Sequence, residues 1–574
     1  MSVQAQGRSF GLWAVILIGA VYGLVFGGMR LALSDNLTLD DAMANVLAQT
    51  LSLGYVERQP PLYEWVLWSV QQLTGPNLLS FLLIKYALLS ATFAFLYLAA
   101  TRIFSDWHWQ VVAGVTPLLL FQFGWNLHEG VTHTMMLSCM VAASFWSFMR
   151  LVERGGARDY LLFGLFIGLG LLSKYNFVGF LVILLICALL QPALRARLLD
   201  WRMLLSLAMA AVVTAPFTYW LIKGQRDLVA VFDDAVAPRA SEWLKARAIG
   251  FVGALYAPFG FLLPLIAILL VGFPRMVPQG WAALKQSVRP RDWPGSTPDW
   301  PLLLLHMTIG GFVFLILGAL LTGATHYLER YMHPFFLLTP LWLLVLVERT
   351  GNAERKVKVL AGLILVLTVL VAPLRAYDLM NSMGPGCGKC RMAIPYDGLG
   401  EALRAGGFRS GTVIATNRDD AGNLRRLFPM RASSVCAIRT TRLRFAPWIA
   451  RRQVPWSGAP PRVKNPQKAR RRNSPRWGRA SRVHRKRSAC PGRPSARPRP
   501  TGTGPGASPS RRRPAPRRNS FFRRPADNVF AWLPAHDSEW SRESFKTPIL
   551  INTPRKRVQC KPILPCILPL VILH

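Results

Sequence analysis

Residues 160–190 have the sequence YLLFGLFIGLGLLSKYNFVGFLVILLICALL, and the way this stretch is divided decides the fold. It is apolar almost throughout, but Ser173, Lys174, Tyr175 and Asn176 interrupt it. A membrane-spanning helix needs about 20 mainly apolar residues, and helices surrounded by other helices can be shorter. The stretch is therefore either one very long helix or two short helices that meet at a polar break.

Nine further apolar runs surround this stretch, so that dividing it in two predicts eleven spans in all. The nine runs occupy residues 10–29, 78–100, 109–124, 131–149, 203–222, 249–272, 302–322, 333–347 and 357–374. The first run is followed directly by more structure and has no small-residue cleavage site, so we expect a retained helix and not a signal peptide.

Assigning each loop to one side of the membrane favours dividing residues 160–190 into two helices. With eleven spans, the basic clusters between them all fall on the side of the N-terminus, and the positive-inside rule makes that side cytoplasmic. With one long helix, the later clusters would change sides. The clusters are Arg102; Arg150, Arg154 and Arg158; Arg195, Arg197 and Arg202; Arg275, Lys285, Arg289 and Arg291; Arg349, Arg355, Lys356 and Lys358.

Composition supports a membrane protein. Of the 574 residues, 52% are hydrophobic and 17% are charged, whereas soluble domains carry about 25% charged residues. A soluble enzyme is nearly excluded. We predict an all-α polytopic membrane protein with about eleven transmembrane helices.

The chain is expected to have three parts. Residues 1–374 form the bundle, with an outer loop at 31–77, and residues 375–445 form a small extracytoplasmic α/β domain. In that domain the pattern predicts helices over 396–405 and 421–428 and a strand over 411–416. In the outer loop it predicts helices over 40–53 and 62–73, the second lying among lipid headgroups.

Residues 446–574 have a different composition. The last 134 residues hold 32 of the 68 basic residues and only four of the 28 acids, within the formal net charge of +40. Such an Arg/Pro-rich stretch cannot bury enough apolar surface to fold, so we expect disorder. A frame error in the gene is favoured over a genuine tail that binds anionic lipid or nucleic acid, and no nucleic acid partner is expected.

Cysteines give little guidance. Cys139 and Cys187 lie in apolar runs and are expected to be packing residues. Cys387 and Cys390 form a C-x-x-C without a second half, which leaves a disulfide and free thiols both open.

The strongest local motif is LTLDDAMANVLAQTLSLGYVERQPPLYEW at residues 37–65. Asp40 and Asp41 stand at the start of a predicted helix, where the helix dipole stabilises carboxylates. Adjacent helical residues cannot point the same way, so one can reach into the bundle while the other holds a partner. The predicted topology puts this loop on the outer face, with Glu129, Lys174 and the turn at 326–333.

This motif resembles the GT-C membrane glycosyltransferases that use polyprenyl-phosphate sugars, a family that includes protein O-mannosyltransferases and the aminoarabinose transferase of lipid A. The family pattern is Asp-Glu after the first span, then Gly-Tyr and His-Pro-Pro-Leu. Here it is Asp40-Asp41, Gly54-Tyr55 and Gln59-Pro60-Pro61-Leu62, so the second acid and the histidine are replaced. The resemblance implies that Asp40 is catalytic and that Tyr55 lies at the substrate site.

Three weaker matches follow in the family's order. Glu129 in GWNLHEGVTH corresponds to a supporting acid, Lys174 in LLSKYNF to an outer lysine, and Arg330-Tyr331 in HYLERYMHPF to an Arg-Tyr pair. The resemblance covers about residues 10–440 and implies a polyprenyl-phosphate sugar donor with a lipid, glycan or protein acceptor.

The chemistry of such a transfer asks little of the protein. The lipid phosphate is already a good leaving group, so inverting transfer needs one carboxylate to take the acceptor's proton. Asp40 is the predicted base, with Asp41 and Glu129 in supporting roles. Lys174 and Arg330 are placed to hold the departing phosphate.

Some residues have two interpretations. Lys85 can reach outward from its span or be a snorkelling lysine, and Arg330 can bind phosphate or pair with Glu329. The histidines at 128, 133, 326 and 333 lack i, i+4 pairing, so no metal is assigned, and no cofactor is expected.

Two other functions remain open: a transporter and a flippase-like lipid binder. Transporters often show internal repeats, and none is evident here. Charged residues at one rim favour an enzyme of a bacterial inner membrane, with a cytoplasmic N-terminus and a periplasmic active face.

Overall fold

The structure is a computed structural model that describes residues 3–128, 130–224, 242–289, 297–383, 391–408, 413–415, 417–429 and 433–435. Contacts divide the chain into residues 1–454 and 455–574, and the description below concerns the first unit. The predictions for Glu129, Cys387, Cys390 and the tail at 446–574 lie outside the described residues.

The described chain is mostly helical, and every predicted apolar run is helical. The first half contains α1 (Val3–Leu33), α2 (Asp40–Leu47), α3 (Leu62–Thr74), α4 (Leu78–Ala100), α5 (Trp107–Val115), η1 (Thr116–Leu119), α6 (Phe121–Gly124), η2 (Asn126–His128), α7 (His133–Arg154), α8 (Ala157–Ser173), α9 (Phe177–Leu190), α10 (Pro192–Leu198) and α11 (Met203–Lys223).

The second half adds the remaining bundle helices and a small α/β unit. These elements are α13 (Trp243–Gly272), α14 (Met276–Ser287), α15 (Trp300–Thr322), η4 (Glu329–Tyr331), α16 (His333–Phe336), α17 (Thr339–Glu348), α18 (Ala353–Asn381), η5 (Arg391–Ala393), α19 (Tyr396–Ala405), β1 (Val413–Ala415), α20 (Arg418–Leu427) and β2 (Ser433–Val435).

Within the described residues, seven helices are long and apolar enough to cross a membrane: α1, α4, α7, α11, α13, α15 and α18. The other predicted spans are shorter. The run at 109–124 is divided into α5, η1 and α6, and the run at 333–347 into α16 and α17. Pro117 and Pro340 stand at the starts of the new pieces, where a missing backbone N–H costs least. The count of eleven stays a prediction.

The division of residues 160–190 is confirmed: α8 ends at Ser173 and α9 begins at Phe177. Lys174 has an extended backbone with φ −168°, and its N–H bonds the Gly170 carbonyl at 3.5 Å. The two helices lie in contact with one another. The sequence between them therefore makes a turn that carries a lysine side chain.

Local sequence explains several helix ends. The Asn77 side chain accepts a hydrogen bond from Ser80 N at 3.3 Å and begins α4, and Asp299 does the same for α15 through Leu302 N at 2.9 Å. Gly155 ends α7 and Gly323 ends α15, both with positive φ.

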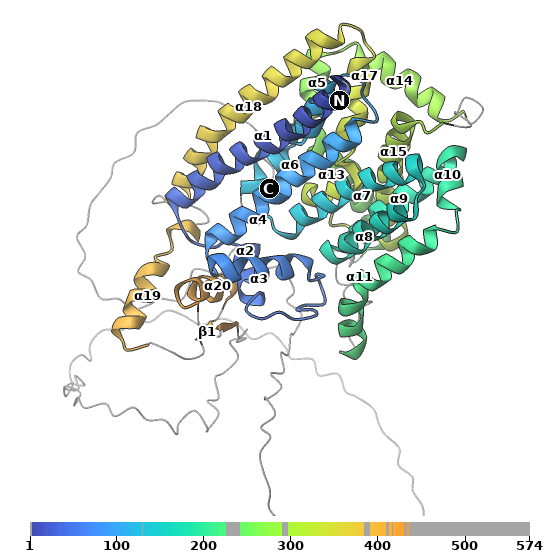
Figure 1. The fold of residues 1–574 in the computed structure, drawn as a ribbon. Helices are drawn as coiled ribbons and strands as arrows, with labels where there is room; N and C mark the ends of the chain where they lie inside the picture. The colour runs from blue at the N-terminus through green and yellow to red at the C-terminus, as the bar shows by residue number, and fades with distance from the viewer. Residues whose placement is uncertain are drawn as a thin grey trace, which may run out of the picture. The chain divides into compact units, whose positions relative to one another are not determined.

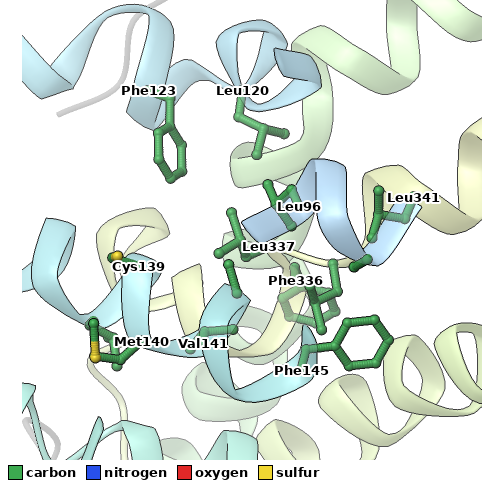
Figure 2. Packing of buried hydrophobic residues seen from close by; sticks show 14 of the residues in the cluster. Leu96, Leu120, Phe123, Cys139, Met140, Val141, Phe145, Phe336, Leu337 and Leu341 are labelled. Atoms are coloured by element: carbon green, nitrogen blue, oxygen red, sulfur yellow. The ribbon is translucent and has the colours of Figure 1, made fainter. Parts of the chain in front are cut away.

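The core of the bundle lies where α4, α7 and α16–α17 meet. Figure 2 shows Leu96 of α4, Val141 and Phe145 of α7, and Phe336 and Leu341 of the last pair packing against one another. All five are buried. α7 is buried around most of its circumference, so it is the central helix around which the others pack.

The two ends of the bundle differ in chemistry. At one end, basic side chains bind helix termini: Arg197 Nε donates to the Val152 carbonyl at 3.1 Å and Arg202 Nη1 to that of Gly155 at 2.9 Å. At the other end lie α2, α3 and the α/β unit, which gather together in Figure 1. We call this second end the loop end.

The small α/β unit joins the loop end. β1 and β2 are parallel, with Val413 opposite Ser433, and α20 connects them. α20 packs on α2, and α19 packs on α20. The described elements thus agree with the predicted helix–strand–helix order, while the location of the unit outside a membrane stays a prediction.

Candidate active site

A strained turn introduces the first acids of the motif. Asp41 N donates to the Thr38 carbonyl at 3.1 Å, and Leu39 between them has φ 53° and ψ −122°. These angles are those of the first central residue of a type II′ turn, a position that strongly favours glycine. A leucine there costs of order 1–3 kcal/mol and persists only when the surroundings enforce it.

The turn sends the two acids to different environments. Asp40 is exposed, whereas Asp41 is only 5% exposed and its Oδ1 has no hydrogen-bond partner among the described residues. Burial raises the pKa of the Asp41 carboxyl above its ordinary value, which Lys85 and Arg30 partly oppose. Asp40 is therefore the carboxylate that an incoming substrate can reach.

Lys174 lies close enough to Asp40 to interact with it electrostatically. The lysine is partly buried in the turn between α8 and α9, and its Nζ donates to Thr134 Oγ1 at 3.1 Å. Burial lowers the pKa of Lys174 to about 8; the Asp40 carboxylate raises it and Arg330 lowers it further. The turn therefore holds a cation that titrates near neutral pH.

Arg330 and Tyr331 complete this side of the site. The Lys174 Nζ lies 5.6 Å from the centre of the Tyr331 ring, and the Arg330 guanidinium lies 5.2 Å from it. Arg330 is exposed and donates to the Tyr331 hydroxyl at 3.3 Å. Within the described chain no ion pair joins Arg330 to Glu329. The structure thus brings four of the predicted residues together: Asp40, Lys174, Arg330 and Tyr331.

Lys85 occupies a different position from either interpretation of its sequence. It is 3% exposed, so it neither snorkels nor reaches outward, and its charge faces the buried Asp41. A buried pair of this kind holds a carboxylate in place because each charge compensates the other's desolvation.

Tyr55 has a role within its own loop. Its hydroxyl donates to the Thr50 carbonyl at 2.8 Å and accepts from Ser52 N at 3.2 Å. The loop is fixed further by Tyr175, whose hydroxyl donates to the Glu57 carbonyl at 2.6 Å. Tyr55 therefore shapes the loop beside Lys174, and its contact with substrate stays a prediction.

Glu129 lies outside the described residues, but its neighbour Gly130 packs directly on the strained turn. A Cβ at Gly130 would lie 2.8 Å from the Thr38 carbonyl oxygen and 3.3 Å from Asp40 N. Such an approach is available only to glycine. Gly130 is thus part of the wall behind Asp40.

A buried Glu64–His133 pair was not predicted from the sequence. Glu64 of α3 and His133 at the start of α7 are both under 5% exposed, and Oε1 of the acid lies 3.0 Å from Nε2 of the histidine. The pair fixes α3 to the most buried helix of the bundle. Its only sequence signal is an acid inside an otherwise apolar, aromatic helix.

The other buried histidines are also engaged by protein groups. His128 lies between the hydroxyls of Tyr22 and Tyr86, at 2.9 and 3.1 Å from its ring nitrogens, and His333 Nδ1 lies 2.9 Å from Ser138 Oγ. These contacts give the rings structural roles in the described chain.

Comparison with known proteins shows which enzymes the chain is similar to. Residues 58–220 match the model of the dolichyl-phosphate-mannose-protein mannosyltransferases. The lipopolysaccharide core galacturonosyltransferase RgtB of Rhizobium johnstonii is 28% identical over 73% of this chain and 81% of its own length. The chain is thus similar over most of its length to a membrane glycosyltransferase, and part of it matches the model of a related family.

Two further proteins are similar to this chain. The lipopolysaccharide core galacturonosyltransferase RgtA of Rhizobium johnstonii is 29% identical over 58% of this chain and 64% of its own length. Among solved structures, ArnT from Cupriavidus metallidurans bound to undecaprenyl phosphate is similar at a TM-score of 0.44 and 14% identity, over 72% of this chain and 75% of that chain. The sequence relatives support a glycosyltransferase, and the seven long apolar helices are those of an integral membrane protein.

Proposed function

We propose that this protein is a GT-C glycosyltransferase that moves a sugar from a polyprenyl-phosphate donor to a hydroxyl group of a lipid, glycan or protein, with inversion, at the outer face of the membrane. The observation that carries the proposal is the exposed Asp40 carboxylate within electrostatic reach of Lys174, next to Arg330. It combines a proton acceptor with cations for a departing phosphate.

In the proposed reaction the acceptor oxygen attacks the anomeric carbon while the bond from that carbon to the phosphate oxygen breaks. The hydroxyl proton passes to the Asp40 carboxylate, and the electron pair leaves with the polyprenyl phosphate. One displacement from the opposite face inverts the anomeric centre. Lys174 and Arg330 stabilise the charge that develops on the phosphate.

Asp41 is proposed to support Asp40 and not to act as the base. Its carboxyl is buried and faces Lys85 and Arg30, so it fixes the start of α2 without reaching an acceptor.

The relatives' names suggest a uronic acid as the transferred sugar and a lipopolysaccharide core as one acceptor. We therefore propose a polyprenyl-phosphate uronic acid ahead of a neutral sugar. Action at the periplasmic face of a bacterial inner membrane is part of the same proposal.

The test is sugar transfer by purified protein in lipid nanodiscs, with polyprenyl-phosphate galacturonate and galactose as alternative donors. Asp40→Asn should abolish transfer while donor binding stays near wild type. Asp35→Asn, which makes the same charge change in an exposed residue of the same loop, should remain active. Transfer by Asp40→Asn would remove Asp40 as the base. Donor movement across the bilayer without transfer would favour a flippase or transporter.

A further inference from the structure

Helix α20 packs against α2, the helix that begins at Asp40, although 377 positions separate Asn45 of α2 from Gly422 of α20. A Cβ at Gly422 would lie 2.7 Å from the Cα of Ala42, so the two helices touch backbone to backbone. Asn45 of α2 adds a bond from its Nδ2 to the Gly422 carbonyl at 2.9 Å. Contacts this close transmit any movement of α20 to α2.

Asn423 binds the chain just before the strained turn. Its side chain is fully buried; Oδ1 accepts from Leu37 N at 2.8 Å and Nδ2 donates to the Leu37 carbonyl at 2.9 Å. Nδ2 also donates to the carbonyl of Asp419, which ties the amide to its own helix at 2.8 Å. One side chain thus satisfies both backbone groups of Leu37, two residues before Leu39.

Arg425 holds the other end of α2. Its Nη2 donates to the Ala48 carbonyl at 3.0 Å and its Nη1 to the backbone carbonyl and, at 3.1 Å, to the side chain of Asn45. Carbonyls in the last turn of a helix lack partners within that helix, and a cation there also suits the helix dipole. Burial lowers the pKa of Arg425 to about 10, so the guanidinium remains charged near neutral pH.

The strain at Leu39 requires such outside support. A left-handed leucine relaxes unless neighbouring groups fix the backbone on both sides. Gly130 presses on the turn from the bundle, and Asn423 fixes the preceding residue from the α/β unit. Relaxation of Leu39 would rotate the peptide that leads into Asp40.

We infer that Asn423 is a positioning residue for the transfer reaction: through Leu37 it fixes the strained turn that directs the Asp40 carboxylate toward the acceptor. The inference rests on the function proposed above. Lys174 and Arg330 lie on other elements, so donor binding does not depend on this contact. Loss of the Asn423 contact therefore slows the chemical step and spares the donor KM.

The experiment measures kcat and donor KM for the full chain and for Asn423→Ala and Asn423→Asp. Displacement of a catalytic group by about 1 Å can cost a hundredfold, so we expect kcat to fall about tenfold to a hundredfold in Asn423→Ala, with KM within about twofold. Asn423→Asp keeps the oxygen that accepts from Leu37 N but loses the amide group that donates to the Leu37 carbonyl. Its kcat should lie between those of the wild type and Asn423→Ala.

Arg404→Ala is the matched control. Arg404 donates to the Leu427 carbonyl at 3.1 Å and covers the Phe428 ring at 5.0 Å, so its loss loosens the α/β unit without touching α2. Its kcat should stay near wild type. An equal fall in kcat would overturn the inference in favour of general loosening of the unit, and so would an unchanged kcat in both Asn423 variants.

Hydrogen exchange separates this inference from the proposed function. The amides of residues 37–47 should exchange faster in Asn423→Ala than in wild type and Arg404→Ala, whether or not sugar is transferred. Unchanged exchange would show that Asn423 does not hold the turn. If the wild-type protein transfers no sugar but the exchange difference is present, the proposed function is wrong, and the contact of Asn423 with Leu37 has a structural role only.

Discussion

Replacing Lys174 with methionine should stabilise the fold and damage the enzyme. The pKa of Lys174 is lowered from 10.5 to about 8 mainly by burial, which means that the folded state holds the charged form at a cost. At about 1.4 kcal/mol for each tenfold change in acid dissociation, that cost is about 3 kcal/mol. The variant also loses the hydrogen bond to Thr134, which lowers its stability by about 1 kcal/mol. The free energy of unfolding of Lys174→Met should therefore exceed that of the wild type by about 2 kcal/mol near pH 7.

The stability difference between Lys174→Met and the wild type should decrease as the pH rises. Below pH 8 the lysine is charged in both the folded and the unfolded protein, so burial of the charge destabilises the folded state by the full amount. As the pH rises from about 8 toward 10.5, the folded state releases its proton first and the cost disappears. The stability advantage of Lys174→Met should therefore be full at pH 7 and be gone near pH 10.5.

Unfolding in mixed micelles at several pH values measures this difference, and transfer assays measure donor KM, which should rise at least about tenfold when a charged hydrogen bond to phosphate is lost. Lys223→Met is the control, because Lys223 also lies 5.5 Å from a tyrosine ring but is exposed. The reasoning is refuted if Lys174→Met is less stable than wild type at pH 7, or if the difference does not change with pH.

Three further predictions concern the loop end. Glu64→Ala should lower the free energy of unfolding by about 1–3 kcal/mol because it leaves His133 buried without its hydrogen-bond partner, and a double-mutant cycle should show coupling of at least about 1 kcal/mol; additive effects would contradict the pair. Gly422→Ala should cost about 1–3 kcal/mol by pushing α20 away from α2, as seen in thermal unfolding. At position 39, Leu39→Gly should be more stable than Leu39→Ala by about 1 kcal/mol, the reverse of the usual order, since glycine alone adopts the left-handed conformation freely; equal stability would mean that the turn is not strained.

Hydropathy predicted the long elements well. The run at 78–100 coincides with α4, and the polar break at 174–176 coincides with the gap between α8 and α9. Apolar runs that contain proline matched the observed helices less well, because Pro117 and Pro340 divide them into shorter helices. Hydropathy averages over such breaks because it reports burial and not backbone hydrogen bonding.

The outer loop shows the limit of periodicity. The predicted helix over 40–53 ends at Leu47, because the following residues fold back through the Tyr55 hydroxyl and its bonds to Thr50 and Ser52. The predicted helix over 62–73 agrees with α3 to within one residue. Its buried Glu64 shows that part of α3 faces protein and not only lipid headgroups.

The candidate site was partly predictable. Counting loop sides placed Asp40, Lys174 and Arg330 at the same end, and the structure brings their charges within reach of one another. The contacts of Asn423 with Leu37 span 386 positions, and no local pattern announces them. The contact between Glu64 and His133 was likewise not predicted, because nothing in the sequence around either residue identifies the other as its partner.

The short pair α8–α9 has a consequence for how a lipid substrate reaches Lys174. The two helices have 17 and 14 residues, or about 26 and 21 Å at 1.5 Å per residue, whereas α4 has 23 residues and about 35 Å. A hydrocarbon layer is about 30 Å thick, so if both helices begin at the cytoplasmic surface, as the predicted topology has it, either the turn between them ends short of the far surface or the bilayer thins around it. A phosphate attached to an isoprenoid chain can then meet the ammonium group sideways from the lipid, with its tail still dissolved in the hydrocarbon and only its sugar projecting into water.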